Sequence, residues 1–339
     1  MKHVPVEESV GMVLCHDITR IVPGEAKGPA FRKGHVICAE DIPLLLDLGK
    51  RNLYALDLSA GELHENDAAR RIASAAAGAG VTLTDPVEGK VNLLADGYGL
   101  LKVNVAALER INRIEDVVFS TLHTGQAVRR RQALAGTRII PLVTSKNKIE
   151  RVEEICAAHF PIVEVRPFAA LTVGIVTTGS EVYHGRIEDR FGPVVQVKFA
   201  ELGSRILRQE FVSDDIEMTV KAIHGLIEDG AQMVTVTGGM SVDPDDQTPA
   251  AIRAAGGNVV TYGAPVLPGA MFMLATIGEV PILGLPGCVM YYRASIFDLV
   301  VPRLLAGETV TREDIAAMGH GGFCSSCEEC RFPSCAFGK

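Results

Sequence analysis

Gly238-Gly239-Met240-Ser241-Val242-Asp243-Pro244-Asp245-Asp246-Gln247-Thr248-Pro249 is the stretch that decides the fold. It follows an apolar run at 232–237, which predicts a buried strand, and it precedes 250–255, which predicts the start of a helix. The stretch is therefore predicted to be a glycine turn at the carboxyl end of a parallel strand. Its backbone N–H groups would suit a phosphate, whereas its aspartates would suit a cation. The alternative is an ordinary turn in which Asp245 or Asp246 caps the next helix.

Composition narrows the class of protein. The chain has 339 residues, of which 47% are hydrophobic, enough for two or three domains with a large core. No apolar run approaches the ~20 residues of a membrane span, and residues 1–8 lack a signal-peptide pattern. We therefore expect a cytoplasmic protein without a membrane partner. A net charge of −8, 5% aromatic residues and no tryptophan argue against nucleic acid as a partner.

The first 166 residues are expected to form two β-rich parts. In 1–58, the pattern predicts strands at 11–18, 31–37 and 53–56, and a short helix at 41–49. In 59–166, an alanine-rich helix at 66–77 precedes short strands at 89–94, 100–103, 117–121 and 137–143. Frequent turns between short strands are typical of a compact β module. The turn around 128–137 resembles those of barrel-sandwich hybrid domains.

The segment 167–311 alternates apolar strands with helices. Strands are predicted at 171–177, 233–237, 258–262 and 280–285, and helices at 194–209, 216–229, 250–255 and 289–305. This alternation predicts an α/β domain of three layers with mostly parallel strands, and ligands at the carboxyl ends of the strands.

Three further turns fall at predicted strand ends in this domain. They are 177–182, 267–271 and 284–288, and each contains glycine, two of them as Pro-Gly. Because the carboxyl ends of parallel strands meet at one edge, these turns should converge with 238–249. The predicted edge then offers hydroxyl groups from Thr178, Ser180 and Ser241 and carboxylates from Glu181, Asp214, Asp243 and Asp246.

The ordered set of these motifs resembles the molybdopterin-binding domain over about 140 residues. The motifs are Gly-Ser-Glu at 179–181, Asp189, Asp214-Asp215, Gly-Gly-Met-Ser-Val at 238–242, Asp246, Pro268-Gly269 and Leu-Pro-Gly at 285–287. Molybdopterin molybdotransferases and molybdopterin adenylyltransferases share this domain. The loop at 246–249 is closer to the adenylyltransferase form. Ser241-Val242 with its nearby aspartate, and the parts 11–18 and 33–56, are closer to the molybdotransferase.

The resemblance implies a function in molybdenum cofactor biosynthesis, with the chain binding molybdopterin or its adenylylated form and inserting molybdate. Carboxylates could hold Mg²⁺, position the oxyanion or accept protons. A homo-oligomer is also implied. The implied catalytic residues are Asp246, Asp214 and Glu181. The implied cofactor-binding residues are Thr178, Gly179, Ser180, Gly238, Gly239, Ser241, Asp243, Pro268, Gly269, Pro286 and Gly287. For Asp214-Asp215, capping of the helix at 216–229 is an equally good interpretation.

Three positions depart from the molybdotransferase pattern. Arg190-Phe191 follows Asp189 where the family has Ser-Asn or Thr-Asn, and Cys288-Val289 stands where Asn-Pro is usual. The basic residue that usually flanks the Pro-Gly turn is missing. Each change removes a polar contact. A non-catalytic carrier or sensor of the pterin is therefore the alternative function, while a nucleotide pyrophosphatase has no positive signal.

The tail, 312–339, is predicted to bind a metal. Its cysteines Cys324, Cys327, Cys330 and Cys335 are spaced Cys-x2-Cys-x2-Cys-x4-Cys, which suits a tetrahedral zinc or a [4Fe–4S] cluster. The compact run of three is closer to cluster-binding ferredoxins, although Pro333 precedes the last cysteine rather than following it. His320 is an alternative ligand. Because the tail is glycine-led and poor in apolar residues, we expect it to be separate from the core.

Overall fold

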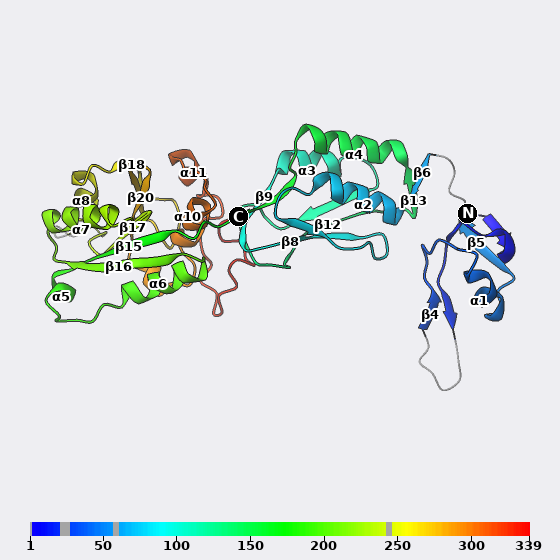
Figure 1. Cartoon of the computed structure of the whole chain (residues 1–339), viewed down its shortest axis with the longest axis horizontal. Coiled ribbons are helices and arrows are strands. Elements are labelled where there is room, and N and C mark those ends of the chain that lie inside the picture. Colours follow the sequence, from blue (N-terminus) through cyan, green and yellow to red (C-terminus); the bar gives the residue numbers. More distant parts are fainter. Residues whose placement is uncertain (1, 21–27, 57–60, 242–245) are drawn as a thin grey trace. The chain divides into compact units, whose positions relative to one another are not determined.

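The computed structural model describes residues 2–20, 28–56, 61–241 and 246–339. The chain divides into two compact units (Figure 1). The first holds 1–97, 101–122 and 128–165, and the second holds 98–100, 123–127 and 166–339. The predicted segment boundaries at 58, 166 and 311 stay predictions.

The N-terminal part of the first unit is a small sheet with one helix. Strand β5 lies between β1 and β2, antiparallel to both, and β3 pairs with β4. Buried Val6, Leu14, Leu45 and Leu53 form its core. The elements are β1 (Lys2–Pro5), η1 (Val6–Glu8), β2 (Val13–Leu14), β3 (Ile18–Arg20), β4 (Gly28–Phe31), α1 (Asp41–Asp47) and β5 (Asn52–Leu56).

The rest of the first unit packs three helices against short strands around one core. The amphipathic helix α2 contacts α4 and strand β12, which explains why its alanine face is buried. Helices α3 and α4 were not predicted, so this module is more helical than its turn-rich sequence indicates. Ends of β9, β11 and β14 belong to the second unit. The elements between 61 and 167 are β6 (Glu62–His64), α2 (Glu65–Ala76), β7 (Val81–Leu83), β8 (Val91–Ala95), β9 (Gly99–Val103), α3 (Val105–Asn112), β10 (Val117–Thr121), β11 (Ala127–Val128), β12 (Ala133–Ile139), β13 (Val143–Ser145), α4 (Lys146–Ala158) and β14 (Val163–Pro167).

The second unit is built on a six-stranded sheet in the order β16-β15-β17-β20-β19-β18. Strands β16, β15, β17 and β20 run parallel, and β19 is antiparallel to both of its neighbours. The predicted α/β sheet with mostly parallel strands is therefore confirmed. The strands are β15 (Thr172–Thr178), β16 (Arg205–Val212), β17 (Met233–Thr237), β18 (Asn258–Tyr262), β19 (Met273–Ile277) and β20 (Val280–Leu285).

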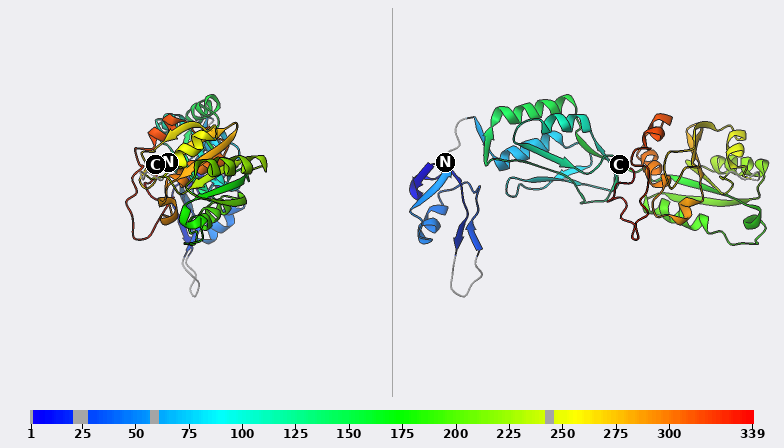
Figure 2. Two further views of the ribbon diagram at one scale, coloured as in Figure 1. Left: turned by 90° about the vertical axis from the view of Figure 1, so that its left-hand side faces the viewer. Right: turned by 180° about the vertical axis from the view of Figure 1, so that it is seen from behind.

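Helices cover both faces of this sheet, which gives the predicted three layers (Figures 1 and 2). Side chains of β15 alternate between two cores: Val173 and Ile175 pack with α6 and α10, and Val176 packs with α7 and α8. All seven residues of β15 are buried, as expected for a strand covered on both faces. The helices are α5 (Ser180–Tyr183), α6 (Phe191–Glu201), α7 (Ile216–Glu228), α8 (Thr248–Ala254), α9 (Cys288–Tyr291), α10 (Ile296–Leu305) and α11 (Arg312–Ala317).

Two predicted helices were too long. The helix predicted at 194–209 ends at Glu201, because Gly203 adopts φ +80° and the chain then enters strand β16. The helix predicted at 289–305 is two helices, since Ser295 and Asp298 form a capping box that begins α10 anew. Strand β19 was missed. Its addition places the carboxyl end of β18 at the same edge as those of β15 and β17.

The tail packs onto the sheet unit, contrary to the expectation that it is separate from the core. Phe337 is 4% exposed and belongs to the core around α10. Leu267 donates its N–H to the Gly322 carbonyl and accepts the N–H of Cys324, both at 2.8 Å. Phe332, Cys324 and Cys335 are partly buried against the same core, so several side chains and a backbone pairing anchor a segment that is poor in apolar residues. Among the described residues, no helix has the length and apolar character that a membrane crossing requires.

Candidate functional site

The carboxyl ends of β15 and β17 meet at a pair of glycine turns. Gly179, Gly238 and Gly239 adopt φ values of +142°, +87° and +54°, which favour glycine over residues with a side chain. A Cβ atom on Gly238 would lie 2.3 Å from the Thr178 carbonyl oxygen. The two turns are therefore packed backbone to backbone.

Thr248 holds the second glycine turn closed. Its hydroxyl donates to the Gly238 carbonyl at 2.9 Å, and its N–H donates to the Gly239 carbonyl at 3.2 Å. Buried Thr178 donates its hydroxyl to the Thr237 carbonyl at 3.3 Å. Helix α8 thus begins against the turn, as the sequence predicts for a glycine turn that opens onto a helix.

The adjacent aspartates Asp214 and Asp215 have different partners. Asp214 accepts the Ser180 N–H at 2.8 Å, and so ties the end of β16 to the turn after β15. Asp215 accepts the Met218 N–H at 2.8 Å and caps helix α7. The capping interpretation is therefore true of Asp215, whereas Asp214 orders the turn that contains Gly179 and Ser180.

A chain of polar contacts crosses the same edge. The Gln209 amide donates to Thr177 at 2.8 Å and to Asp189 Oδ2 at 2.6 Å. Asp189 also accepts the N–H groups of Phe191 and Gly192, at the start of α6. Because these bonds occupy its carboxylate, Asp189 positions the start of α6.

These elements line an open pocket of about 530 Å³. Threonines at the ends of β15 and β17 line it, together with apolar and aromatic side chains from α5, α9, the start of α6 and the loop between α5 and α6. Arg190 adds a cation. This combination suits a flat heterocycle that carries an anionic group. The lining residues are Thr177, Thr178, Val182, Ile187, Glu188, Asp189, Arg190, Phe191, Thr237, Gly238, Met290 and Tyr291.

The other predicted acidic and hydroxyl residues lie around this edge without lining the pocket. Glu181 is exposed in the first turn of α5, and Ser241 is exposed at the end of the described glycine turn. Asp246 is half-buried and immediately precedes the N-cap of α8. Asp243 lies outside the described residues.

The two Pro-Gly turns differ in their surroundings. Gly269 is buried, and a Cβ atom there would lie 2.5 Å from that of Ile296, so the Pro268-Gly269 turn packs on the start of α10. Gly287 is exposed with open space around it and follows the buried Pro286. Burial raises the pKa of the neighbouring Cys288 thiol, which favours its neutral form. The Pro268-Gly269 turn is therefore a packing turn, and Gly287 leaves backbone accessible.

No preformed metal cage is found in the described part of the chain. There, no three His, Cys, Asp or Glu side chains are placed to hold one ion. The carboxylates at the sheet edge are individually engaged, as Asp214 and Asp189 show.

Sequence reasoning missed several residues of the pocket. Thr177, Thr237 and Tyr291 line it but were given no role. Arg190 was noted only as a departure from the family pattern, and Gln209, which binds Asp189 beside the pocket, was not singled out. Thr177 and Thr237 lie near the carboxyl ends of β15 and β17, where the Thr237 hydroxyl donates to the Thr177 hydroxyl at 3.2 Å, so strand alternation could have identified them. Gln209 lay in a predicted helix and gave no signal.

The part of the chain that matches a known family model contains this site. Residues 174–306 match the family model described as "Probable molybdopterin binding domain", and residues 3–57 match a model described as "Domain of unknown function (DUF8806)". A "Molybdopterin molybdenumtransferase" of Synechococcus elongatus is 25% identical over 228 residues, which are 62% of this chain and 56% of that protein. A "Molybdenum cofactor biosynthesis bifunctional protein" of the same organism is 30% identical over 96 residues, which are 27% of this chain and 30% of that protein.

A "CinA-like protein" of Mycobacterium tuberculosis is 35% identical over 78 residues, 22% of this chain and 17% of that protein. The chain thus matches about half or less of the length of these curated relatives. Among solved structures, the MoaB proteins of Thermus thermophilus and Pyrococcus furiosus are each 20% identical. Their TM-scores are 0.33 and 0.34, and the matches cover 41% and 42% of this chain and 98% of each structure.

Proposed function

We propose, from the premise that residues 174–306 are a molybdopterin-binding domain, that this chain binds molybdopterin and inserts molybdate during molybdenum cofactor biosynthesis. The observation that carries the proposal is the pocket at the carboxyl ends of β15 and β17, which lies within the matched residues. Molybdopterin is a pterin with a dithiolene and a terminal phosphate. The aromatic side chains suit the pterin ring, while Arg190 and the glycine turns suit the phosphate.

The chain's own residues would have distinct roles. Asp214 positions the turn at 179–180 through the Ser180 N–H. Asp246, at the end of the glycine loop, is the candidate to orient molybdate or accept a proton as an oxo group leaves. Glu181 is exposed at the same edge and is the second candidate. The described carboxylates do not form a Mg²⁺ cage, so the proposal assigns no step to a protein-bound Mg²⁺.

A pterin carrier without catalytic activity is the second candidate. The observation that favours it is the engagement of Asp189 by Gln209 and by the start of α6. In addition, Cys288 stands where the resemblance expects an asparagine, and its raised pKa favours a neutral thiol. A carrier needs the pocket but does not need a group that transfers protons.

Reconstitution of an apo-molybdoenzyme separates these two functions. Purified protein is incubated with molybdopterin, molybdate and Mg²⁺, and the recovered enzyme activity and the pterin Kd are both measured. We expect Asp246→Asn to retain pterin binding and to lose at least tenfold in insertion rate. The matched control is Asp229→Asn, because Asp229 follows α7 at the opposite edge of the sheet. Full activity of Asp246→Asn would exclude its catalytic role, and binding without any wild-type turnover would establish the carrier.

A further inference from the structure

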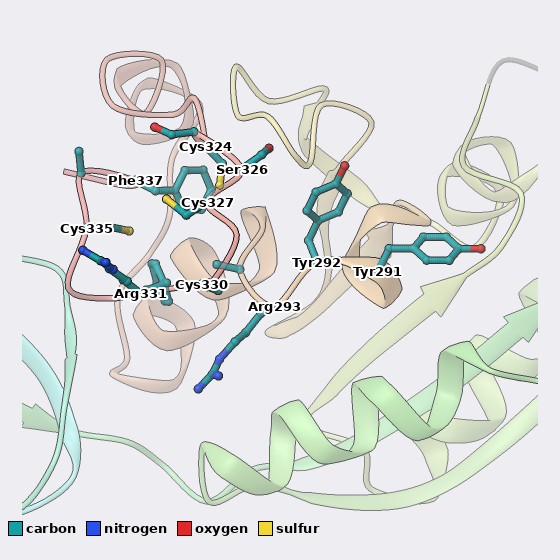
Figure 3. A pocket seen from close by; sticks show the side chains of 14 residues that line it. Tyr291, Tyr292, Arg293, Cys324, Ser326, Cys327, Cys330, Arg331, Cys335 and Phe337 are labelled. Atoms are coloured by element: carbon teal, nitrogen blue, oxygen red, sulfur yellow. The ribbon is translucent and has the colours of Figure 1, made fainter.

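All four cysteines of the tail line one pocket of about 210 Å³, and the molybdopterin proposal does not use them (Figure 3). The same pocket is lined by Tyr291, the last residue of α9, and by the segment that follows it to Ala294. Cys327 and Cys330 are exposed, and Cys324 and Cys335 are half-buried. Four thiols around one cavity are an unusual concentration of soft ligands.

The segment that carries these thiols is closed and anchored. Gly338 donates its N–H to the Gly321 carbonyl at 2.9 Å, which brings the two ends of the segment together. Leu267 pairs with Gly322 and Cys324 at one end, and buried Phe337 holds the other end in the core. The pocket is therefore part of the folded unit.

The sequence spacing of the thiols, a compact run of three followed by a fourth, favours a cluster over one metal ion, since zinc sites usually hold their ligand pairs further apart. A single zinc requires four sulfur atoms at about 2.3 Å from one point. Within the described residues, no three potential ligands converge in that way, and Figure 3 shows the four cysteines spread around the loop. A [4Fe–4S] cluster is instead bound at separate corners by four thiolates, with inorganic sulfide between them.

The other residues of the pocket suit a negatively charged cluster. Arg293 and Arg331 both line it and would offset the charge of four thiolates. Phe332 and Phe337, whose rings meet edge to face at 6.0 Å, supply an apolar wall. Apolar shielding and nearby positive charge are two of the ways in which proteins tune such clusters.

We infer that Cys324, Cys327, Cys330 and Cys335 bind a [4Fe–4S] cluster in this pocket. Each thiol releases one proton and forms one iron–sulfur bond, and a cluster-assembly system or a reconstitution mixture supplies two ferrous ions, two ferric ions and four sulfides, so that no further oxidant is needed. The inference does not depend on the ligand that binds at the sheet edge.

Metal analysis of the full-length protein, purified anaerobically and reconstituted with ferrous and ferric iron and sulfide, tests this inference. We expect about four iron and four acid-labile sulfide per chain and a broad visible absorption that bleaches on reduction. Cys327→Ser and Cys330→Ser should lose most of the iron and sulfide. The matched control is Cys38→Ser, since Cys38 is an exposed cysteine outside the pocket, and it should retain both.

Two results would overturn the inference. One is stoichiometric zinc without sulfide, and the other is no cluster after reconstitution. Circular dichroism of each variant checks that it is folded. If the serine variants do not fold, the wild-type protein still decides, because the electron paramagnetic resonance spectrum of the reduced protein either shows a [4Fe–4S] signal or lacks one.

Discussion

The second unit contains two sites that are organised in different ways. One is the glycine edge, formed by the turns at Gly179 and at Gly238-Gly239, and the other is the cysteine pocket, lined by the four cysteines of the tail. At the glycine edge, backbone contacts fix the site, with Gly238 packed against the Thr178 carbonyl. In the cysteine pocket, side chains surround a cavity and do not contact one another as a ligand set. Tyr291 lines both pockets. The comparison indicates that backbone packing fixes the shape of the first site, whereas the second is a cavity lined by side chains.

The largest expected effect is on the stability of a Gly238 variant, which tests whether backbone contacts fix the glycine edge. Gly238→Ala places a Cβ atom 2.3 Å from the Thr178 carbonyl at φ +87°. We expect a loss of about 4 kcal/mol or more in the free energy of unfolding, because the neighbour is backbone and cannot rotate away. Urea denaturation measures this loss.

Gly287→Ala is the matched control, because no atom lies within 4 Å of its Cβ position and its φ is −53°. It should change the stability by about 0.5 kcal/mol or less. Equal stability of the two variants would contradict a backbone-fixed glycine edge.

The next effect concerns the anchor of the tail. Phe337→Ala should cost about 3 kcal/mol, because a buried ring is lost from the core and a cavity remains. Phe323→Ala is the control, since Phe323 is 74% exposed in the same tail. Thermal unfolding of both variants gives the measurement. A Phe337→Ala protein as stable as the control would show that the tail is a separate module after all.

Substitutions of the two adjacent aspartates should both lower the stability, but only the substitution of Asp214 should weaken pterin binding. Asp214→Ala removes the acceptor of the Ser180 N–H, and we expect a loss of about 1–2 kcal/mol together with weaker pterin binding. Asp215→Ala removes only the cap of α7, with a loss of about 1 kcal/mol and unchanged affinity. Denaturation and pterin titration of both variants check this. Equal affinities would remove Asp214 from the site.

The smallest effect is a pH dependence at the start of the tail. Burial opposes ionisation of Asp314, but hydrogen bonds from Thr311 and Arg303 outweigh it and lower the pKa to about 2. The stabilisation is therefore present above the ordinary pKa of 3.8 and is lost as the pH falls toward 2.

Asp314→Asn should cost about 1 kcal/mol at pH 7, a modest value because the carboxylate is one-third exposed. Its difference from the wild type should shrink as the pH falls from about 4 through about 2, as measured by urea denaturation across pH. A difference that stays constant over this range would show that the carboxylate charge is not its cause.

Local sequence patterns were sufficient to predict strands and turns whose conformation depends on their own residues. The buried strands at 233–237 and 280–285 and the glycine turn at 238–239 were predicted, because an apolar run and a glycine pair are local signals. Helix ends were predicted less well. The boundaries at Glu201 and Ser295 depend on Gly203 and on a capping box, and both lie within otherwise helical patterns.

In the site, too, some residues could be predicted from local patterns and others could not. Thr178 and Gly238 were predicted to lie together and do line one pocket, since both follow from parallel strands meeting at one edge. Gln209 was not predicted, because its contacts with Thr177 and Asp189 join positions 20 or more residues away. Which neighbouring aspartate would cap α7 was also undecided, since both precede the helix.

The sequence by itself determined that the strands and helices between residues 171 and 305 would form a layered α/β sheet with glycine turns at one edge, because strand and helix periodicity and glycine conformation are local properties. Only the tertiary structure decided that Asp214 serves the turn and Asp215 the helix, that Phe337 anchors the tail, and that four thiols surround one cavity. These outcomes depend on distances between segments far apart in the chain. Those distances are set by how the strands and helices pack, which no local pattern encodes.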